Sequence, residues 1–285
     1  MPETSPEVTQ PAACVIGYPA KHSRSPTLHK YWIKRYGVNA DYRAEEIAPD
    51  DIEKFILTLS EQGYVGANVT MPYKDIACRL AEADERATTV GAANTLWFKN
   101  GLLRATNTDI EGFIHALDAA APGWDSRTDE AIVLGAGGAG RAIVYGLLER
   151  SVTAIHVVNR SQDKAATLRD KFGDKVKPAG WDKLSELIRS CSLLINTTSL
   201  GMKNSEPLNI DITPLPGHAV VSDIVYVPLT TSLLNAAKQR GHPTVNGLDM
   251  LLHQAVRGFE LWFGIRPEVT SELYDLLAKD IQAGH

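Results

Sequence analysis

Short runs of apolar residues alternate along the chain with longer stretches in which apolar residues recur at helical spacing. In the first part, this pattern predicts strands at 13–17 and 64–69, an extended segment at 41–46, and helices near 26–36 and 50–62. Strands that alternate with helices are typical of a mostly parallel sheet with helices packed on its faces. The first part of the chain is therefore expected to form one α/β unit.

The alternation starts again after residues 119–127, a stretch that contains Pro122 and Gly123. The second series consists of predicted strands at 131–134, 154–158, 192–195 and 219–222, helices near 139–150, 162–171 and 230–240, and two long final helices at 248–263 and 268–282. This order of elements is that of a doubly wound parallel sheet. The fold class is therefore α/β with two domains, a mixed and mostly parallel one and a doubly wound one.

The length and composition agree with two domains, and the charge limits the kinds of molecule that the protein is expected to bind. The chain has 285 residues, which at roughly 150 residues per domain corresponds to about two domains. Hydrophobic residues make up 44% and the formal net charge is -5, as in an ordinary globular protein. An acidic balance argues against nucleic acid or an anionic membrane as the main partner. A small molecule is the expected partner.

The cysteines and the N-terminus bear on location. Three cysteines, Cys14, Cys78 and Cys191, lie far apart and in none of the spacings of metal or redox motifs, so they are expected to be buried thiols in a reducing compartment, with no metal bound. Residues 1–12 lack the basic-then-apolar pattern of a targeting signal and are expected to be a loose tail. The apolar stretch 131–148 contains five glycines and one arginine, unlike a membrane span. A soluble, cytoplasmic protein is expected.

A glycine pattern follows the first strand of the second series. Residues 131–134 lead directly into Gly135, Gly137 and Gly140, which have the Gly-x-Gly-x-x-Gly spacing of dinucleotide-binding turns. In such a turn the first glycine permits the tight bend, the second lets the backbone approach a pyrophosphate, and the third lets the helix pack against the strand. The helix N-terminus then offers free N–H groups to the phosphates. The pattern predicts a bound dinucleotide.

The end of the next strand bears on which dinucleotide is bound. An NAD site usually has an acidic residue there for the ribose 2′-hydroxyl, whereas this chain has Asn159 and Arg160, with Lys164 one turn later. A guanidinium can pair with a 2′-phosphate. Asp163 would oppose such a phosphate, and the basic residues could instead be a solvated helix start. We expect NADP rather than NAD.

Polar clusters in the first part carry the candidate chemistry. Ser23 and Ser25, just before Pro26, can direct hydroxyls toward a carboxylate or polyol, although Ser25 could also be only the N-cap of the following helix with Pro26 at its first position. Asn68 and Thr70 follow a strand and are expected on one side of it.

Other polar residues admit two interpretations each. Lys74 comes next in a loop that Pro72 restrains, and could be an ordinary surface charge. Asn94 can both donate and accept hydrogen bonds. The residues from Thr108 to Glu111 fit a capping box by themselves. Gln254 shares a helix face with apolar residues and needs a partner, which a ligand hydroxyl or a backbone carbonyl could supply.

Taken together, these motifs resemble the shikimate/quinate dehydrogenase family over essentially the whole chain. The matching segments are His22-Ser23-Arg24-Ser25-Pro26, Asn68-Val69-Thr70-Met71-Pro72-Tyr73-Lys74, Gly91-Ala92-Ala93-Asn94-Thr95, Asn107-Thr108-Asp109, 135–140, Asn159-Arg160, 196–202, 223–226 and 247–254. The resemblance implies a discontinuous substrate-binding domain of residues 1–109 and 247–285, and a Rossmann NADP-binding domain of residues 110–246.

The resemblance also implies a set of site residues. The catalytic pair would be Lys74 and Asp109. Shikimate would be held by Ser23, Ser25, Thr70, Lys74, Asn94, Asp109, Tyr226 and Gln254. NADP would contact Glu85, Gly135, Ala136, Gly137, Gly138, Ala139, Asn159, Arg160, Ser161, Lys164, Thr197, Ser199, Met202, Ile224 and Gly247.

The implied activity is the NADP-dependent interconversion of 3-dehydroshikimate and shikimate, by a monomer or a homodimer, in the biosynthesis of chorismate and aromatic amino acids. A lysine and a carboxylate suit this reaction, because oxidation of a secondary alcohol requires a group that takes the hydroxyl proton. Which of Lys74 and Asp109 takes the proton is open. The alternatives are a quinate/shikimate dehydrogenase that uses NAD and, in another class, a non-catalytic NADP-sensing protein.

Overall fold

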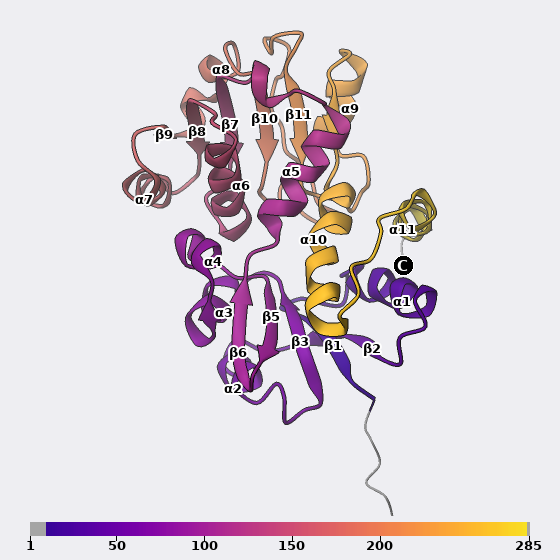
Figure 1. The fold of residues 1–285 in the computed structure, drawn as a ribbon. Helices are drawn as coiled ribbons and strands as arrows, with labels where there is room; N and C mark the ends of the chain where they lie inside the picture. Colours follow the sequence, from indigo (N-terminus) through magenta and orange to yellow (C-terminus); the bar gives the residue numbers. More distant parts are fainter. Residues whose placement is uncertain (1–9, 284–285) are drawn as a thin grey trace, which may run out of the picture.

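The computed structural model describes residues 10–283, so most of the expected N-terminal tail lies outside the described residues. The chain forms two six-stranded sheets, one above the other in Figure 1, joined by helices α5 (Asp109–Ala120) and α10 (Gly247–Phe263). This confirms the α/β fold class. Within residues 10–283, no helix combines the length and the apolar character needed to cross a membrane.

The first sheet is mixed and has the strand order β2-β1-β3-β5-β6-β4. Its strands are β1 (Ala12–Gly17), β2 (Asp41–Glu46), β3 (Tyr64–Val69), β4 (Glu82–Ala83), β5 (Thr95–Lys99) and β6 (Leu102–Thr106). Its helices are α1 (Ser25–Arg35), α2 (Ile52–Leu57), α3 (Lys74–Leu80) and α4 (Glu85–Val90). Strand β1 pairs in parallel with β2 and β3, as the alternation predicts.

The pattern did not predict the antiparallel pairs in this sheet. Strand β5 runs antiparallel to both β3 and β6. Asn100 and Gly101 join β5 to β6, and both have positive φ, 54° and 77°. An Asn-Gly pair between two apolar runs is a strong hairpin signal, and it could have been recognised in the sequence.

The helix expected near 50–62 is shorter, because α2 ends at Leu57 and turns follow. The hydroxyl of Thr58 donates to the Lys54 carbonyl, and the Gln62 amide donates to the Thr58 hydroxyl. Gly63 then takes a φ of 83°. Side-chain hydrogen bonds of this kind compete with helix continuation.

The second sheet is parallel throughout, with the strand order β12-β11-β10-β7-β8-β9. Its strands are β7 (Glu130–Leu134), β8 (Ala154–Val158), β9 (Val176–Ala179), β10 (Leu193–Asn196), β11 (Val220–Asp223) and β12 (Thr244–Val245). Its helices are α6 (Gly138–Glu149), α7 (Gln162–Phe172), α8 (Leu184–Leu187) and α9 (Ser232–Gln239), with short 3₁₀ turns at Asp125–Arg127 and Trp181–Lys183. The order reverses between β7 and β10, where ligands bind in doubly wound sheets.

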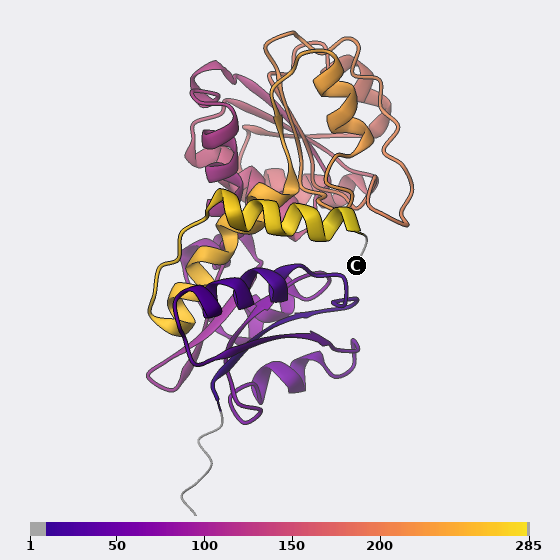
Figure 2. The same ribbon diagram turned by 90° about the vertical axis from the view of Figure 1, so that its right-hand side faces the viewer.

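The last helix, α11 (Ser271–Ala283), returns to the first sheet and lies beside α1, as both views show (Figures 1 and 2). An apolar cluster holds the two helices and α10 together. It includes Leu28, Trp32, Phe259, Leu273 and Leu277, all fully buried. The C-terminal helices therefore pack with the first sheet, although the second sheet precedes them in the chain.

Candidate functional site

Lys74 and Asp109 form an ion pair between the two sheets. Lys74 is the first residue of α3 and not part of a loop, which corrects the expectation from Pro72, and Asp109 is the first residue of α5. The Lys74 Nζ lies 2.5 Å from the Asp109 Oδ2, and the two side chains are only 17% and 6% exposed. The surface-charge interpretation of Lys74 is therefore wrong.

Asn94 connects this ion pair to α10. Its Nδ2 donates to the second carboxylate oxygen of Asp109, at 2.8 Å, and to the Oε1 of Gln254, at 3.2 Å. The backbone N–H of Thr108 donates to the Asn94 Oδ1 at 2.8 Å, which orients the amide. Because both oxygens of Asp109 accept hydrogen bonds, the carboxylate is held in one position before any ligand arrives.

The capping box expected at the start of α5 is absent. The Thr108 side chain makes no cap hydrogen bond and instead donates to the Asn94 Oδ1 at 3.1 Å. Asn107 accepts from the Asp109 N–H at 3.1 Å, and Glu111 pairs with Arg86 at 3.0 Å. The side chains at the start of α5 therefore bond to residues of the polar site. The local motif alone predicted the wrong partners for Thr108 and Glu111.

Gln254 reaches the site because α5 and α10 approach closely. A Cβ added to Gly112 would lie 2.7 Å from the Gln254 Cβ and from the Met250 carbonyl oxygen, so only glycine fits there. The Gln254 Nε2 donates to the Leu251 carbonyl at 3.1 Å, while its Oε1 faces Asn94. The expected backbone-carbonyl partner is therefore present, and the second partner is the Asn94 side chain. The sequence analysis missed Gly112, although a glycine inside a helix is itself a signal of close packing.

Residues 23–25, here called the serine segment, follow the carboxyl end of β1. Arg24, not Ser25, is the N-cap residue of α1, and Ser25 begins the helix with Pro26 next. The backbone N–H of Ser25 donates to the Ser23 Oγ at 3.2 Å. Ser25 is buried and Ser23 half-buried, as is Thr70 just beyond β3. The interpretation of Ser25 as the N-cap, with Pro26 at the first helical position, is therefore wrong.

Tyr226 contacts the backbone of Arg24, and Asn68 lies at the end of β3. Burial raises the pKa of the half-buried Tyr226, and a hydrogen bond from the Arg24 backbone partly counteracts that rise. The Asn68 Oδ1 accepts from the Tyr42 hydroxyl at 2.7 Å, and its Nδ2 donates to the Thr95 Oγ1 at 3.3 Å. Asn68 is thus already engaged by protein groups and supports the first sheet behind the site.

His29 is a buried polar residue that the sequence analysis did not assign. Its ring stacks on Tyr42 with a centroid distance of 4.1 Å and is fully buried. Burial lowers the pKa of His29 to about 3. The imidazole is therefore neutral near pH 7 and supports the aromatic packing behind the serine segment.

The glycine turn has the geometry that its spacing predicts. Gly135 has a φ of 106°, and a Cβ on Gly140 would collide with the carbonyl oxygen of Gly135. A Cβ on Gly137 would meet nothing within 4 Å, so the backbone there is open to a large ligand. A Cβ on Gly138 would lie 3.4 Å from the Lys74 Cδ. The turn therefore borders the Lys74–Asp109 pair.

The strand end after β8 lies beside this turn. The Asn159 Oδ1 accepts from the Ala136 N–H at 3.2 Å, and Ala139 follows within α6. Arg160, Ser161 and Lys164 are exposed. Among residues 10–283, no acidic side chain forms an ion pair with Arg160. The guanidinium is therefore accessible to an anionic ligand, although Asp163 is exposed nearby in sequence.

The remaining predicted cofactor residues divide into two groups. Gly247 packs so tightly that a Cβ would collide with the Ile224 carbonyl, and the Thr197 Oγ1 donates to the Leu134 carbonyl at 2.7 Å, so Ile224 and Thr197 border the reversal of the sheet. Ser199 and Met202 lie beyond β10, where Met202 is exposed and Ser199 is at the surface of the same turn. Glu85 is exposed at the start of α4, which contacts α6.

Asp223, at the end of β11, is a further buried carboxyl. Desolvation by burial raises its pKa to about 6, although Thr231, the Val225 N–H and Asn196 donate hydrogen bonds to it. It fixes the turn that leads to Ile224 and Tyr226. Its role is thus structural support for a predicted ligand-binding segment.

The cysteines agree only in part with the expectation that all three are buried thiols. All three cysteines are free, Cys14 and Cys191 are buried, and Cys78 is only half-buried, which corrects that expectation. Within residues 10–283, no group of three or more potential metal ligands comes together.

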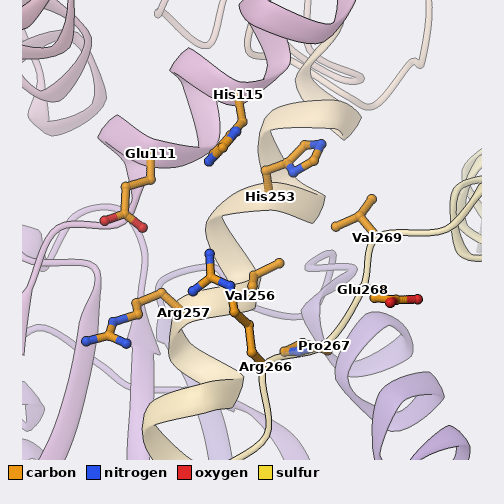
Figure 3. A pocket seen from close by; sticks show the side chains of 9 residues that line it. All are labelled: Glu111, His115, His253, Val256, Arg257, Arg266, Pro267, Glu268 and Val269. Atoms are coloured by element: carbon orange, nitrogen blue, oxygen red, sulfur yellow. The ribbon is translucent and has the colours of Figure 1, made fainter.

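A separate cavity of about 380 Å³ lies on the outer side of α5 and α10 (Figure 3). His115 and His253 face each other there, with ring centroids 5.5 Å apart. Arg257 and Arg266 both pair with Glu260. No predicted site residue lines this cavity.

Three segments of the chain match known protein families. Residues 15–96 match the shikimate dehydrogenase substrate binding domain, residues 116–204 match shikimate / quinate 5-dehydrogenase, and residues 247–271 match the shikimate 5'-dehydrogenase C-terminal domain. A curated shikimate dehydrogenase (NADP(+)) from Rhodopseudomonas palustris strain TIE-1 is 58% identical over 96% of this chain and 98% of its own length.

Solved structures are similar over nearly the whole fold. Shikimate 5-dehydrogenase from Thermus thermophilus, in complex with NADP(H) and shikimate, has a TM-score of 0.84 at 29% identity, covering 95% of this chain and 99% of that one. Quinate dehydrogenase from Corynebacterium glutamicum, in complex with NAD, has a TM-score of 0.85 at 28% identity, covering 94% and 99%. These two solved structures therefore hold different dinucleotides.

Proposed function

The chain belongs to the shikimate dehydrogenase family, and on that premise we propose that Lys74 and Asp109 carry the proton in its reaction. The reaction is the reversible, NADP-dependent reduction of 3-dehydroshikimate to shikimate, a step toward chorismate and the aromatic amino acids. The observation that supports the roles is the buried 2.5 Å ion pair beside the glycine turn.

Lys74 and Asp109 together take and return the proton in this reaction. When bound, NADP would supply the acceptor for a hydride from the carbinol carbon of shikimate, or the donor of a hydride to the ketone. As the alcohol is oxidised, its hydroxyl proton passes to the Lys74–Asp109 pair, and in the reverse direction the pair returns it. Asn94 holds the Asp109 carboxylate through its 2.8 Å hydrogen bond. The pair is therefore aligned for transfer at one atom of the substrate.

The other proposed substrate residues come from the segments that follow β1, β3 and β11 and from helix α10. Ser23, Ser25, Thr70, Tyr226 and Gln254 supply hydroxyl and amide groups that fit a carboxylate and several hydroxyls. Residues 1–109 and 247–285 make up the substrate-binding domain, and residues 110–246 make up the NADP-binding domain. The packing of α10 and α11 against the first sheet supports this division.

The residues around the glycine turn fit NADP. Gly137 leaves room for a pyrophosphate, and Arg160 offers an accessible guanidinium to the 2′-phosphate. Asn159 accepts a hydrogen bond from the Ala136 N–H in this turn, and Ile224 and Gly247, which pack against each other, complete the proposed cofactor contacts.

Location and assembly follow as further parts of the proposal. Free cysteines support a reducing, cytoplasmic location. The assembly state that we propose is a monomer or a homodimer. Light scattering during size-exclusion chromatography separates these states.

A matrix of initial rates tests the activity: shikimate or quinate, each with NADP or NAD, followed by absorbance of the reduced nicotinamide. The expected result is strong turnover with shikimate and NADP alone. The likeness to an NAD-bound quinate dehydrogenase makes that enzyme the second candidate, and comparable rates with quinate and NAD would establish it. No turnover in any combination would favour a non-catalytic NADP sensor.

A further inference from the structure

The Arg24 side chain is buried in the middle of the serine segment. It is 9% exposed, and its Nε lies 3.0 Å from the Asp280 Oδ2, on the last turn of α11. These two residues are 256 positions apart by their residue numbers, so the ion pair joins the start of the first domain to the end of the chain. Burying a charge costs free energy unless the charge is paired, so Arg24 is expected to need a partner such as Asp280.

Neither charge stabilises the helix that carries it. Arg24 is the N-cap of α1, where the helix dipole is positive, and Asp280 lies in the last turn of α11, where the dipole is negative. A cation at the first end and an anion at the second are both unfavourable. The two charges are therefore placed for each other and not for their own helices.

Arg24 also lies among the groups predicted to hold the substrate. It stands between Ser23 and Ser25, and the Ser25 N–H donates to the Ser23 Oγ across it. Its backbone forms a hydrogen bond with Tyr226. A shift of Arg24 would therefore move three predicted substrate contacts together.

The position of α11 does not depend on this ion pair. Leu273 and Leu277 pack against Leu28 and Trp32, and Glu272 accepts a hydrogen bond from the Tyr31 hydroxyl at 2.9 Å. The helix is therefore held in place by these other contacts, and the ion pair between Asp280 and Arg24 is added to them.

We propose that Arg24 is a positioning residue, held by Asp280 so that the Ser23 and Ser25 hydroxyls stand where the substrate binds. This inference rests on the proposed function, because it assigns these hydroxyls to shikimate. It predicts that α11, which contributes no predicted substrate contact, controls the affinity for shikimate.

The test compares Asp280→Asn with Asp275→Asn, the same change at an exposed position of α11. Steady-state kinetics should show a KM for shikimate raised about tenfold in Asp280→Asn, with kcat and the KM for NADP within about twofold, because the substitution removes the charge that faces Arg24 at 3.0 Å. Asp275→Asn should match the parent protein. Titration calorimetry with shikimate alone should show the same loss of affinity.

Arg24 variants separate position from charge. Arg24→Met should raise the shikimate KM at least as much as Asp280→Asn, Arg24→Lys should recover part of the loss, and the Arg24→Met/Asp280→Asn double variant should be no worse than Arg24→Met alone. Thermal unfolding of each variant identifies loss of folded protein, and calorimetry on the folded fraction then gives its shikimate affinity.

Several outcomes would overturn the inference. A shikimate KM unchanged in Asp280→Asn would show that the ion pair does not position the serines. A lowered KM would show that Arg24 acts on the anionic substrate by charge. Equal losses for shikimate and NADP would assign the pair a general structural role. Absence of shikimate oxidation in the parent protein would instead contradict the proposed function.

Discussion

The predicted ligand contacts around the two sheets differ in whether they are already bonded to other protein groups. Around the parallel sheet β7–β12, the predicted contacts are backbone positions and exposed side chains, such as Gly137 and Arg160. Around the mixed sheet β1–β6, they are side chains already hydrogen-bonded to one another, with Asp109 held by Lys74 and Asn94. The cofactor side keeps space open, whereas the substrate side fixes groups in place.

This difference follows from what each ligand needs. A dinucleotide is long, and its phosphates bind to backbone N–H groups at a helix N-terminus, so room and a suitable backbone are sufficient. Proton transfer requires heavy atoms within hydrogen-bond distance and in fixed orientation. Substitutions on the two sides should therefore change different kinetic constants.

Lys74→Ala should have the largest effect. Removing a group that acts in the transition state should lower kcat by at least about 100-fold, with a smaller change in KM. Initial rates with shikimate and NADP measure this. Lys99→Ala, at an exposed end of the same sheet, serves as the control and should be unaffected. Turnover close to that of the parent would remove Lys74 from the mechanism.

Gly140→Ala should lower stability, whereas Gly137→Ala should weaken cofactor binding. The methyl group at 140 collides with the Gly135 carbonyl, so thermal unfolding should show a loss of stability of about 1–3 kcal/mol. The methyl group at 137 meets nothing within 4 Å, so stability should be unchanged while the KM for NADP rises. If both variants lost stability alike, the open space at Gly137 would not be a cofactor site.

Arg160→Ala should sharpen the identity of the dinucleotide. Losing a charge-assisted contact to the 2′-phosphate should raise the KM for NADP about tenfold or more and leave the KM for NAD nearly unchanged. Arg189→Ala, exposed in the same half of the chain, is the matched control. An equal effect of Arg160→Ala on both dinucleotides would mean that another group reads the phosphate.

His29, near the first sheet, and Asp223, in the second, should change the stability of the protein with pH in opposite directions. The pKa of His29 is lowered to about 3, so the folded state favours the neutral ring, and the stability this provides is lost as pH falls from about 6.5 toward 3. The pKa of Asp223 is raised to about 6, so the folded state favours the protonated acid, and stability is lost as pH rises from about 4 to 6.

Urea unfolding midpoints between pH 4 and 7 measure both slopes. Each group can contribute at most about 1.4 kcal/mol per pH unit. His29→Phe should reduce the loss of stability in acid, and Asp223→Asn should reduce the loss between pH 4 and 6. Slopes identical to the parent's would contradict the burial assigned to these two groups.

Local patterns predicted well the parts of the fold that depend on neighbouring residues. The strand and helix positions of the second series agree with the structure to within a few residues, and the turn from 135 to 140 has the expected backbone. The missed Asn100-Gly101 hairpin and the early end of α2 concern local signals, whereas the errors at the site arose where a side chain has a distant partner. Thr108 fits a capping box in sequence, yet it bonds to Asn94.

The sequence by itself determined the α/β alternation, the glycine turn and the family resemblance, because helical spacing, strand content and positive φ are properties of short segments. Only the tertiary structure decided that Lys74, Asn94, Asp109 and Gln254 meet, that Gly112 allows it, and that Arg24 pairs with Asp280. These contacts depend on how α5, α10 and α11 pack against the first sheet. That packing is the sum of many apolar contacts between segments far apart in the chain, which no local pattern records.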